Sequence, residues 1–195
     1  MKASLRILCS LIILALAVST RPALAQPTMS DSERLAALEA GCAQGDNSFC
    51  ELLRLRFGRE TGSRERYAYF TRRSCETGLA RQCTAYAARM AVGSTGFPPP
   101  TRSIQADYAL RGCRGGDADG CSLASSYAKR SNPYTESERT YIHDRVCDIG
   151  TPADCGAAAY AIGEEQRWER AHTLARRACS RGDGNSCTNV EAYRV

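Results

Sequence analysis

The segment RRACSRGDGNSC, residues 176–187, contains two cysteines eight positions apart, with a glycine and an aspartate between them. This spacing of eight occurs five times along the chain. The pairs are Cys42 and Cys50, Cys75 and Cys83, Cys113 and Cys121, Cys147 and Cys155, and Cys179 and Cys187. Successive pairs are 33, 38, 34 and 32 residues apart, a period that is typical of helical repeat proteins.

The spacing within each pair predicts two helices rather than one. Residues eight apart on one straight helix lie ~12 Å apart along its axis, whereas a disulfide requires Cα atoms roughly 4.4–6.8 Å apart. Two antiparallel helices joined by a tight turn meet this requirement. We therefore expect each cysteine to bond to its partner eight residues away, one ending the first helix of a hairpin and the other beginning the second.

The residues between the paired cysteines predict the same hairpin independently. A glycine stands three residues after each first cysteine, where a helix commonly ends in a left-handed residue. These glycines are Gly45, Gly78, Gly116, Gly150 and Gly182. The next residue is of an N-capping type in four units, and those residues are Asp46, Asp117, Thr151 and Asp183. Leu79 takes this place in the second unit, which should start its second helix differently.

Two further positions recur in the expected first helices. An apolar residue five positions before the first cysteine predicts the buried face, and these residues are Ala37, Phe70, Tyr108, Ile142 and Leu174. Four units carry an arginine two positions before the first cysteine, where a cation suits the helix dipole. These arginines are Arg73, Arg111, Arg145 and Arg177.

The residues at these recurring positions resemble those of a known protein family. A helix that ends in x-[AS]-C-x-x-G-D, with a cysteine eight positions on, is similar to the Sel-one-like repeat, an α/α repeat related to the tetratricopeptide type. Residues 176–187 and 111–117 match this pattern best. A cysteine pair in every unit is similar to the exported subgroup of that family, the Helicobacter cysteine-rich proteins.

The resemblance implies an all-α fold, a right-handed solenoid of about five disulfide-bridged hairpins over residues 26–195. The units are expected at about 30–62, 63–97, 101–134, 135–164 and 165–195. A single hairpin buries little surface, so neighbouring hairpins are expected to stack. The glycine-rich turn between family units is poorly kept here, and residues 93–97 are its closest remnant.

The first 25 residues read as a secretory signal. Lys2 and Arg6 precede an apolar run at 7–18, and Ala23–Ala25 form an A-x-A cleavage site. Cleavage after Ala25 would remove Cys9 and leave an even ten cysteines. Since disulfides persist in the periplasm and outside the cell, we expect a periplasmic or secreted protein with no membrane span after cleavage.

Charge and cysteine spacing exclude two classes of partner. Removal of the signal leaves 23 basic and 21 acidic residues, which is no nucleic-acid footprint. Structural zinc favours cysteines two to four residues apart, a spacing that none of the pairs has. We expect no metal and no cofactor.

Two short motifs could carry chemistry, and the sequence assigns no catalytic residue from either. Ser126–Lys129 matches S-x-x-K, the nucleophile motif of penicillin-binding proteins and serine β-lactamases, but K-T-G and S-D-N are missing. Asp117–Gly120 resembles half of a calcium loop without its downstream glutamate, and capping explains Asp117 better. His143 and His172 are isolated on first helices and are expected at the surface or in a groove.

The join between the second and third units, residues 92–101, is the strongest interaction feature. Its proline triplet should be extended and stiff. Phe97 is either held out for a partner or tucked over an interface, and we favour tucking. Trp168 is expected to pack against the fourth unit, with a ligand contact as the alternative, and the four arginines form either a stripe for an acidic partner or a solvated edge. The candidate binding residues are Phe97, Arg73, Arg111, Arg145, Arg177 and Trp168.

The sequence favours binding over catalysis. Solenoids present extended surfaces, and no nucleophile, base and orienting residue come together. We predict an exported scaffold for a protein, a peptide or a cell-envelope component. Two alternatives stay open. One is a β-lactam-binding or weakly hydrolysing enzyme, implied only by the resembled subgroup, and the other is a secreted effector acting on a host.

Overall fold

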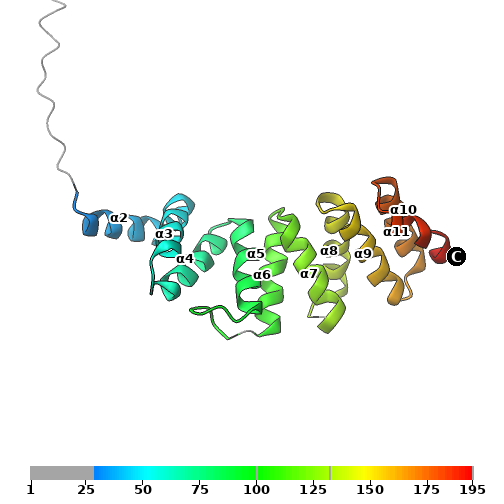
Figure 1. Ribbon diagram of the computed structural model, residues 1–195, viewed down its shortest axis with the longest axis horizontal. Coiled ribbons are helices and arrows are strands. Elements are labelled where there is room, and N and C mark those ends of the chain that lie inside the picture. The colour runs from blue at the N-terminus through cyan, green and yellow to red at the C-terminus, as the bar shows by residue number, and fades with distance from the viewer. Residues whose placement is uncertain (1–28, 100, 132, 195) are drawn as a thin grey trace, which may run out of the picture. The chain divides into compact units, whose positions relative to one another are not determined.

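A computed structural model describes residues 29–99, 101–131 and 133–194, so the expected signal, residues 1–25, lies outside the described residues. The described residues form ten α-helices and one 3₁₀ helix and contain no strand (Figure 1). The helices are α2 Asp31–Ala43, α3 Asn47–Arg59, α4 Arg64–Glu76, α5 Ala80–Ala91, α6 Arg102–Arg114, α7 Ala118–Ser131, α8 Glu136–Ile149, α9 Pro152–Glu164, α10 Trp168–Ser180, α11 Gly184–Asn189 and η1 Glu191–Tyr193. The predicted all-α class is therefore confirmed for this part of the chain.

The chain divides into two compact units, Met1–Ala36 and Ala37–Val195. Every helix from α3 onward belongs to the second unit. Within it, successive helices pack pairwise, as in a helical repeat solenoid (Figure 1).

Five disulfides join consecutive helices, each from the end of one helix to the first turn of the next. They are Cys42–Cys50, Cys75–Cys83, Cys113–Cys121, Cys147–Cys155 and Cys179–Cys187. Their Cα atoms lie 4.2–4.6 Å apart, far closer than one continuous helix would allow. Every bridge thus spans eight residues and a turn, the arrangement that the sequence predicts.

Four of the five bridged turns close as the sequence predicts. Gly45, Gly78, Gly116 and Gly182 have φ values of 92°, 109°, 89° and 98°. The N–H of the residue after each glycine donates to a backbone carbonyl five positions earlier at 3.0 Å, as in Asp117 to Gly112. This pattern satisfies carbonyl groups that the helix end would otherwise leave without a partner.

The fourth turn differs, and the prediction of a left-handed Gly150 is wrong. Gly150 has φ −82° and ψ −176°, which is extended backbone. The cause lies in the next helix, where the N–H of Thr151 donates to Asp154 Oδ2 at 3.0 Å in a capping box. Because this N–H is occupied, it cannot bond back to the first helix. An acidic residue three positions after Thr151 was the signal in the sequence.

Alanine and cystine dominate the interior of the second unit. Among the described residues, seven alanines from five helices are 0% exposed, namely Ala87, Ala109, Ala124, Ala158, Ala171, Ala175 and Ala178. Such small side chains allow close approach, and a Cβ added to Gly112 in α6 would lie 3.3 Å from the carbonyl oxygen of Ala80 in α5. Of the residues predicted to form the buried face, Ala37 is exposed and Tyr108 is half-buried, whereas the other three are buried.

Polar contacts connect the second helix of each of the first three bridged pairs to the start of the second helix of the following pair. The residue directly after the second cysteine takes part each time. Glu51 accepts from Arg81 at 3.1 Å, Thr84 donates to Asp117, and Ser122 donates to Asp154 Oδ1 at 3.0 Å. We call these three contacts the polar ladder. The sequence pattern did not single it out, although a polar residue follows four of the five second cysteines.

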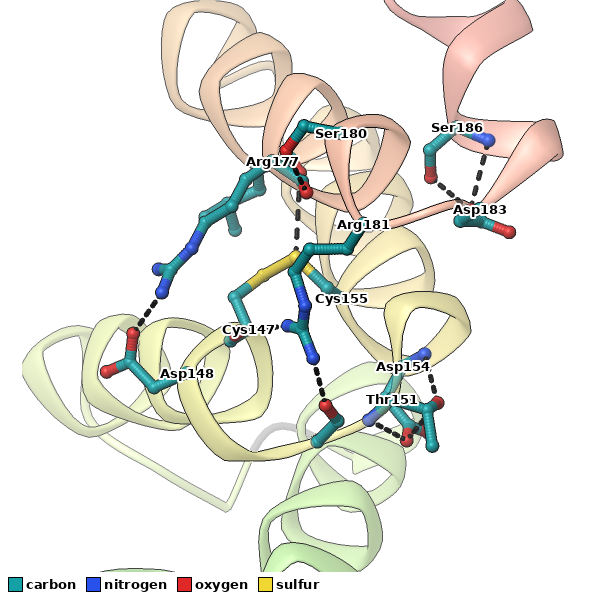
Figure 2. The surroundings of a disulfide bond; sticks show 12 residues. Cys147, Asp148, Thr151, Asp154, Cys155, Arg177, Ser180, Arg181, Asp183 and Ser186 are labelled. Carbon is teal, nitrogen blue, oxygen red and sulfur yellow. Dashed lines mark hydrogen bonds and ion pairs between the residues drawn. A yellow bond between two sulfur atoms is a disulfide. The ribbon is translucent and has the colours of Figure 1, made fainter.

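The last two bridged helix pairs are connected differently, through Arg177 of α10 and Arg181, the residue that follows this helix. Arg177 donates to Asp148 Oδ1 at 2.5 Å, and Arg181 donates to the carbonyl oxygens of Cys147 and Gly150 (Figure 2). Both arginines reach the turn beside the Cys147–Cys155 disulfide (Figure 2). In this region, hydrogen bonds and an ion pair therefore join successive helix pairs, in addition to apolar contacts.

Candidate functional site

The long join between α5 and α6 runs against the start of α4. Gly93 and Gly96 have φ values of 64° and 86°, and a Cβ added at Gly96 would lie 2.6 Å from the carbonyl carbon of Arg64. Only a residue without a side chain fits this approach. Pro98 and Pro99 have no regular secondary structure, and Pro100, the last of the triplet, lies outside the described residues.

Phe97 is tucked over the helices, which confirms the favoured prediction. Its ring centroid lies 5.3 Å from that of Tyr86 and 6.1 Å from that of Tyr67. These distances are typical of favourable aromatic pairs. The side chain is half-buried, and it lines two cavities next to the join.

The first cavity, which we call the basic pocket, has a volume of about 540 Å³. It lies between α3, α4, the last turn of α5 and the join. Tyr67 and Phe97 supply aromatic surface. The charged side chains that line it are Arg54, Arg59, Arg64, Arg89 and Glu60.

Two arginines of the basic pocket flank the ring of Tyr67. The guanidinium carbon of Arg89 lies 5.1 Å from the ring centroid and that of Arg54 lies 5.9 Å from it, within the range of cation–π contacts. Arg54 also donates to both oxygens of Glu51, at 2.7 and 2.8 Å. This bond holds the pKa of the Glu51 carboxyl below its ordinary value.

Two further grooves share Tyr69 and Glu65 as lining residues. One, about 430 Å³, is lined by α2 and α4. The other, about 470 Å³, reaches from α4 to Tyr86 of α5 and to Phe97 and Pro98 of the join. We call them the Tyr69 grooves.

Tyr69 lines both grooves and contacts two neighbouring side chains. The residue is 49% exposed; its ring lies edge-on to Phe70 at 5.0 Å, and the Arg72 guanidinium lies 5.9 Å from the ring centroid. Arg66 pairs with Glu39 across one groove and lies 4.0 Å from the ring centroid of Phe57. Sequence analysis missed Tyr69, because its register in the first helix carries no aromatic in most other units.

The four arginines near the first-helix ends are all paired with carboxylates of the chain itself. Their partners are Glu76 at 2.9 Å for Arg73, Asp107 at 2.9 Å for Arg111, and Asp148 at 3.9 Å for Arg145 and 2.5 Å for Arg177. An acidic partner would have to displace these contacts. Their proposed binding role stays a prediction, and none of these four arginines carries an unpaired charge to support it.

Trp168 stacks on an aromatic ring of its own unit, and the expected packing against the fourth unit stays a prediction. Trp168 is 41% exposed and stacks on Tyr193 of the last unit, with centroids 6.2 Å apart. The chain end causes this, because η1 returns Tyr193 to the start of α10, where it also covers Gly163. The expectation that His143 lies at the surface or in a groove is wrong, because it is 1% exposed in the core, whereas His172 is half-buried.

The two motifs with possible chemistry have structural roles in α7. The Ser126 hydroxyl donates to the Leu123 carbonyl oxygen at 2.7 Å, and the side chain of Lys129 lies outside the described part. Asp117 caps the helix by accepting from the Gly120 N–H at 3.1 Å, and it also accepts from Thr84. Capping by Asp117 is therefore confirmed.

The chain matches no model of a known protein family and no curated protein. Among the helices in the described ranges, none is both long and apolar enough to cross a bilayer. The same residues contain no group of three or more His, Cys, Asp or Glu that could hold a metal ion. The five disulfides fit an oxidising compartment, either the periplasm or the cell exterior.

Proposed function

We propose that the protein is an exported repeat scaffold that binds an extended segment of a partner protein. The resemblance in sequence supports a right-handed solenoid of five Sel-one-like repeats, with residence in the periplasm or outside the cell. The partner would be a protein, a peptide or another cell-envelope component.

The Tyr69 grooves are the observation that carries this proposal. Interfaces between proteins favour exposed aromatic side chains and arginines as anchors, and Tyr69 with Arg72 and Arg66 supplies both kinds. Two neighbouring grooves that share one aromatic side chain suit an extended chain, whose successive side chains point to different sides. A segment that passes over Tyr69 would place side chains in both grooves.

A peptide display experiment with matched tyrosine variants tests the proposal. The oxidised protein is screened against a random peptide library, and the enriched peptides are titrated against wild type, Tyr69→Ala and Tyr160→Ala. Tyr160 is a suitable control, because it is 52% exposed and lies in α9 away from both grooves. We expect Tyr69→Ala to weaken binding by a factor of about 30, corresponding to ~2 kcal/mol, and Tyr160→Ala to have little effect.

Failure would take one of two forms. A library that yields no enriched peptide would contradict a peptide-binding role. Equal losses in the two variants would show that peptides bind elsewhere, and the grooves would then have no part in the function.

A further inference from the structure

Three arginines of the basic pocket carry charge that the chain does not neutralise. Arg59, Arg64 and Arg89 are exposed. Among the described residues, none of the three has a carboxylate within ion-pair distance, in contrast to the four arginines near the first-helix ends. These three unpaired arginines converge on one cavity.

The carboxylates near the pocket do not cancel this charge. Glu60, which lines the pocket, accepts from Arg56 at 3.0 Å and from the Ser63 hydroxyl at 3.1 Å. Glu51 is occupied by Arg54 and Arg81. Glu60 and Glu51 are therefore both paired with arginines other than Arg59, Arg64 and Arg89. The guanidinium groups of those three remain for a ligand.

The shape and composition of the pocket restrict the class of ligand that it can bind. A volume of about 540 Å³ falls within the ~300–1,000 Å³ of ordinary ligand sites. Guanidinium groups bind carboxylates through paired hydrogen bonds, while Tyr67 and Phe97 offer apolar surface to the methylene groups of an acidic side chain. The pocket thus presents both kinds of contact that a glutamate or aspartate side chain can use.

We propose that the basic pocket binds an acidic segment of the partner protein. This inference rests on the proposed function and adds the chemistry of the partner. A polyanion such as nucleic acid would need a long track of free cations, but the arginines near the first-helix ends are paired with carboxylates. A short acidic stretch matches the compact charge of the pocket better.

A labelled hexaglutamate peptide tests the proposal directly, with hexaglutamine as the uncharged control. Fluorescence anisotropy is measured for the oxidised wild type, for the pocket variant Arg59→Gln/Arg64→Gln/Arg89→Gln, and for the matched variant Arg114→Gln/Arg176→Gln/Arg194→Gln. The matched variant removes equal charge from exposed arginines outside the pocket. Circular dichroism of both variants confirms that they remain folded.

We expect hexaglutamate to bind the wild type and hexaglutamine not to bind. The pocket variant should lose affinity by about tenfold or more, a change that corresponds to ~1.4 kcal/mol, and the matched variant should keep most of it. High salt should weaken the complex, because exposed charges are screened. An equal loss in both variants would overturn the proposal, as would binding of inorganic phosphate or heparin fragments without binding of hexaglutamate.

The outcome is separable from the test of the proposed function. Displayed peptides that depend on Tyr69 but show no enrichment in acidic residues would overturn this inference and leave the proposed function in place. Hexaglutamate binding that the pocket variant loses would support the acidic-segment site even where display returns no peptide.

Discussion

Mild reduction should open Cys179–Cys187 before any other disulfide. Cys187 is exposed and Cys179 is half-buried, whereas the eight cysteines of the other four bridges are at most 5% exposed. A reducing thiolate must approach the sulfur that it attacks. In the native state, only this bridge allows such an approach without prior unfolding.

The consequence of opening this bridge can be estimated from the helix that it holds. By the loop-entropy model, closure of an eight-residue loop stabilises by ~2.5 kcal/mol. The second cysteine lies in α11, which has six residues, well below the ~12–15 residues of a marginally stable isolated helix. Reduction should therefore release α11 and η1. The preceding helices should remain folded, because stability in stacked repeats is largely local.

Alkylation under graded dithiothreitol, followed by peptide mapping, measures the order of opening. We expect a first plateau at two labelled cysteines, both in the peptides of Cys179 and Cys187. Far-ultraviolet circular dichroism should show only a small helical loss at that plateau. The double variant Cys179→Ser/Cys187→Ser should lack this phase and reduce its other bridges as the wild type does. Labelling of Cys113 or Cys147 in the first phase would refute the reasoning.

Three further predictions follow from other parts of the structure. Gly93→Ala should lower the free energy of unfolding by ~1–2 kcal/mol, because its backbone is left-handed. Gly96→Ala should lower it further, because its Cβ would lie 2.6 Å from the Arg64 backbone. Equal unfolding midpoints for the two variants would contradict this prediction. Tyr134 is buried with its hydroxyl donating to the Ala106 carbonyl oxygen at 2.8 Å, and burial raises its pKa. The protonated hydroxyl of Tyr134 therefore stabilises the fold fully below pH ~10, the pKa of tyrosine in the unfolded chain, and this stabilisation is lost at higher pH. In denaturant titrations above pH ~10, the stability of Tyr134→Phe should therefore decline less than that of the wild type. Finally, the oxidised protein should not hydrolyse a chromogenic cephalosporin above background, and Ser126→Ala should change nothing; turnover that Ser126→Ala abolishes would favour the enzyme alternative.

Much of the local structure was predictable because its determinants lie within a dozen residues of one another. Paired cysteines, a left-handed glycine and a capping side chain all act inside one turn, so residues 176–187 specify their hairpin without reference to the rest of the chain. Gly150 shows that a single residue can change the structure of such a turn. One aspartate three positions after Thr151 diverts a single N–H and changes the backbone at the glycine.

The candidate site was less predictable, since it depends on residues far apart in the sequence. Phe97 could be singled out from the irregular join, but the basic pocket requires Arg59, Arg64 and Arg89 to converge from three segments. Nothing in their spacing distinguishes them from Arg73 or Arg177, which find carboxylates in the fold. Whether an arginine is paired or free is decided by packing, and a pattern within a single repeat does not record it.

The site lies where the repeat is least regular, and the structure gives a reason. The step from Cys75 to Cys113 is 38 residues, against 32 to 34 for the others. The disulfide within each bridged pair fixes its turn, so additional residues in a step are accommodated in the join between pairs. There, Ser94 and Thr95 line the basic pocket, Gly96 and Pro98 line one of the Tyr69 grooves, and Phe97 lines both cavities. A change in the join can therefore reshape the binding surface while the bridged turns on either side keep their geometry.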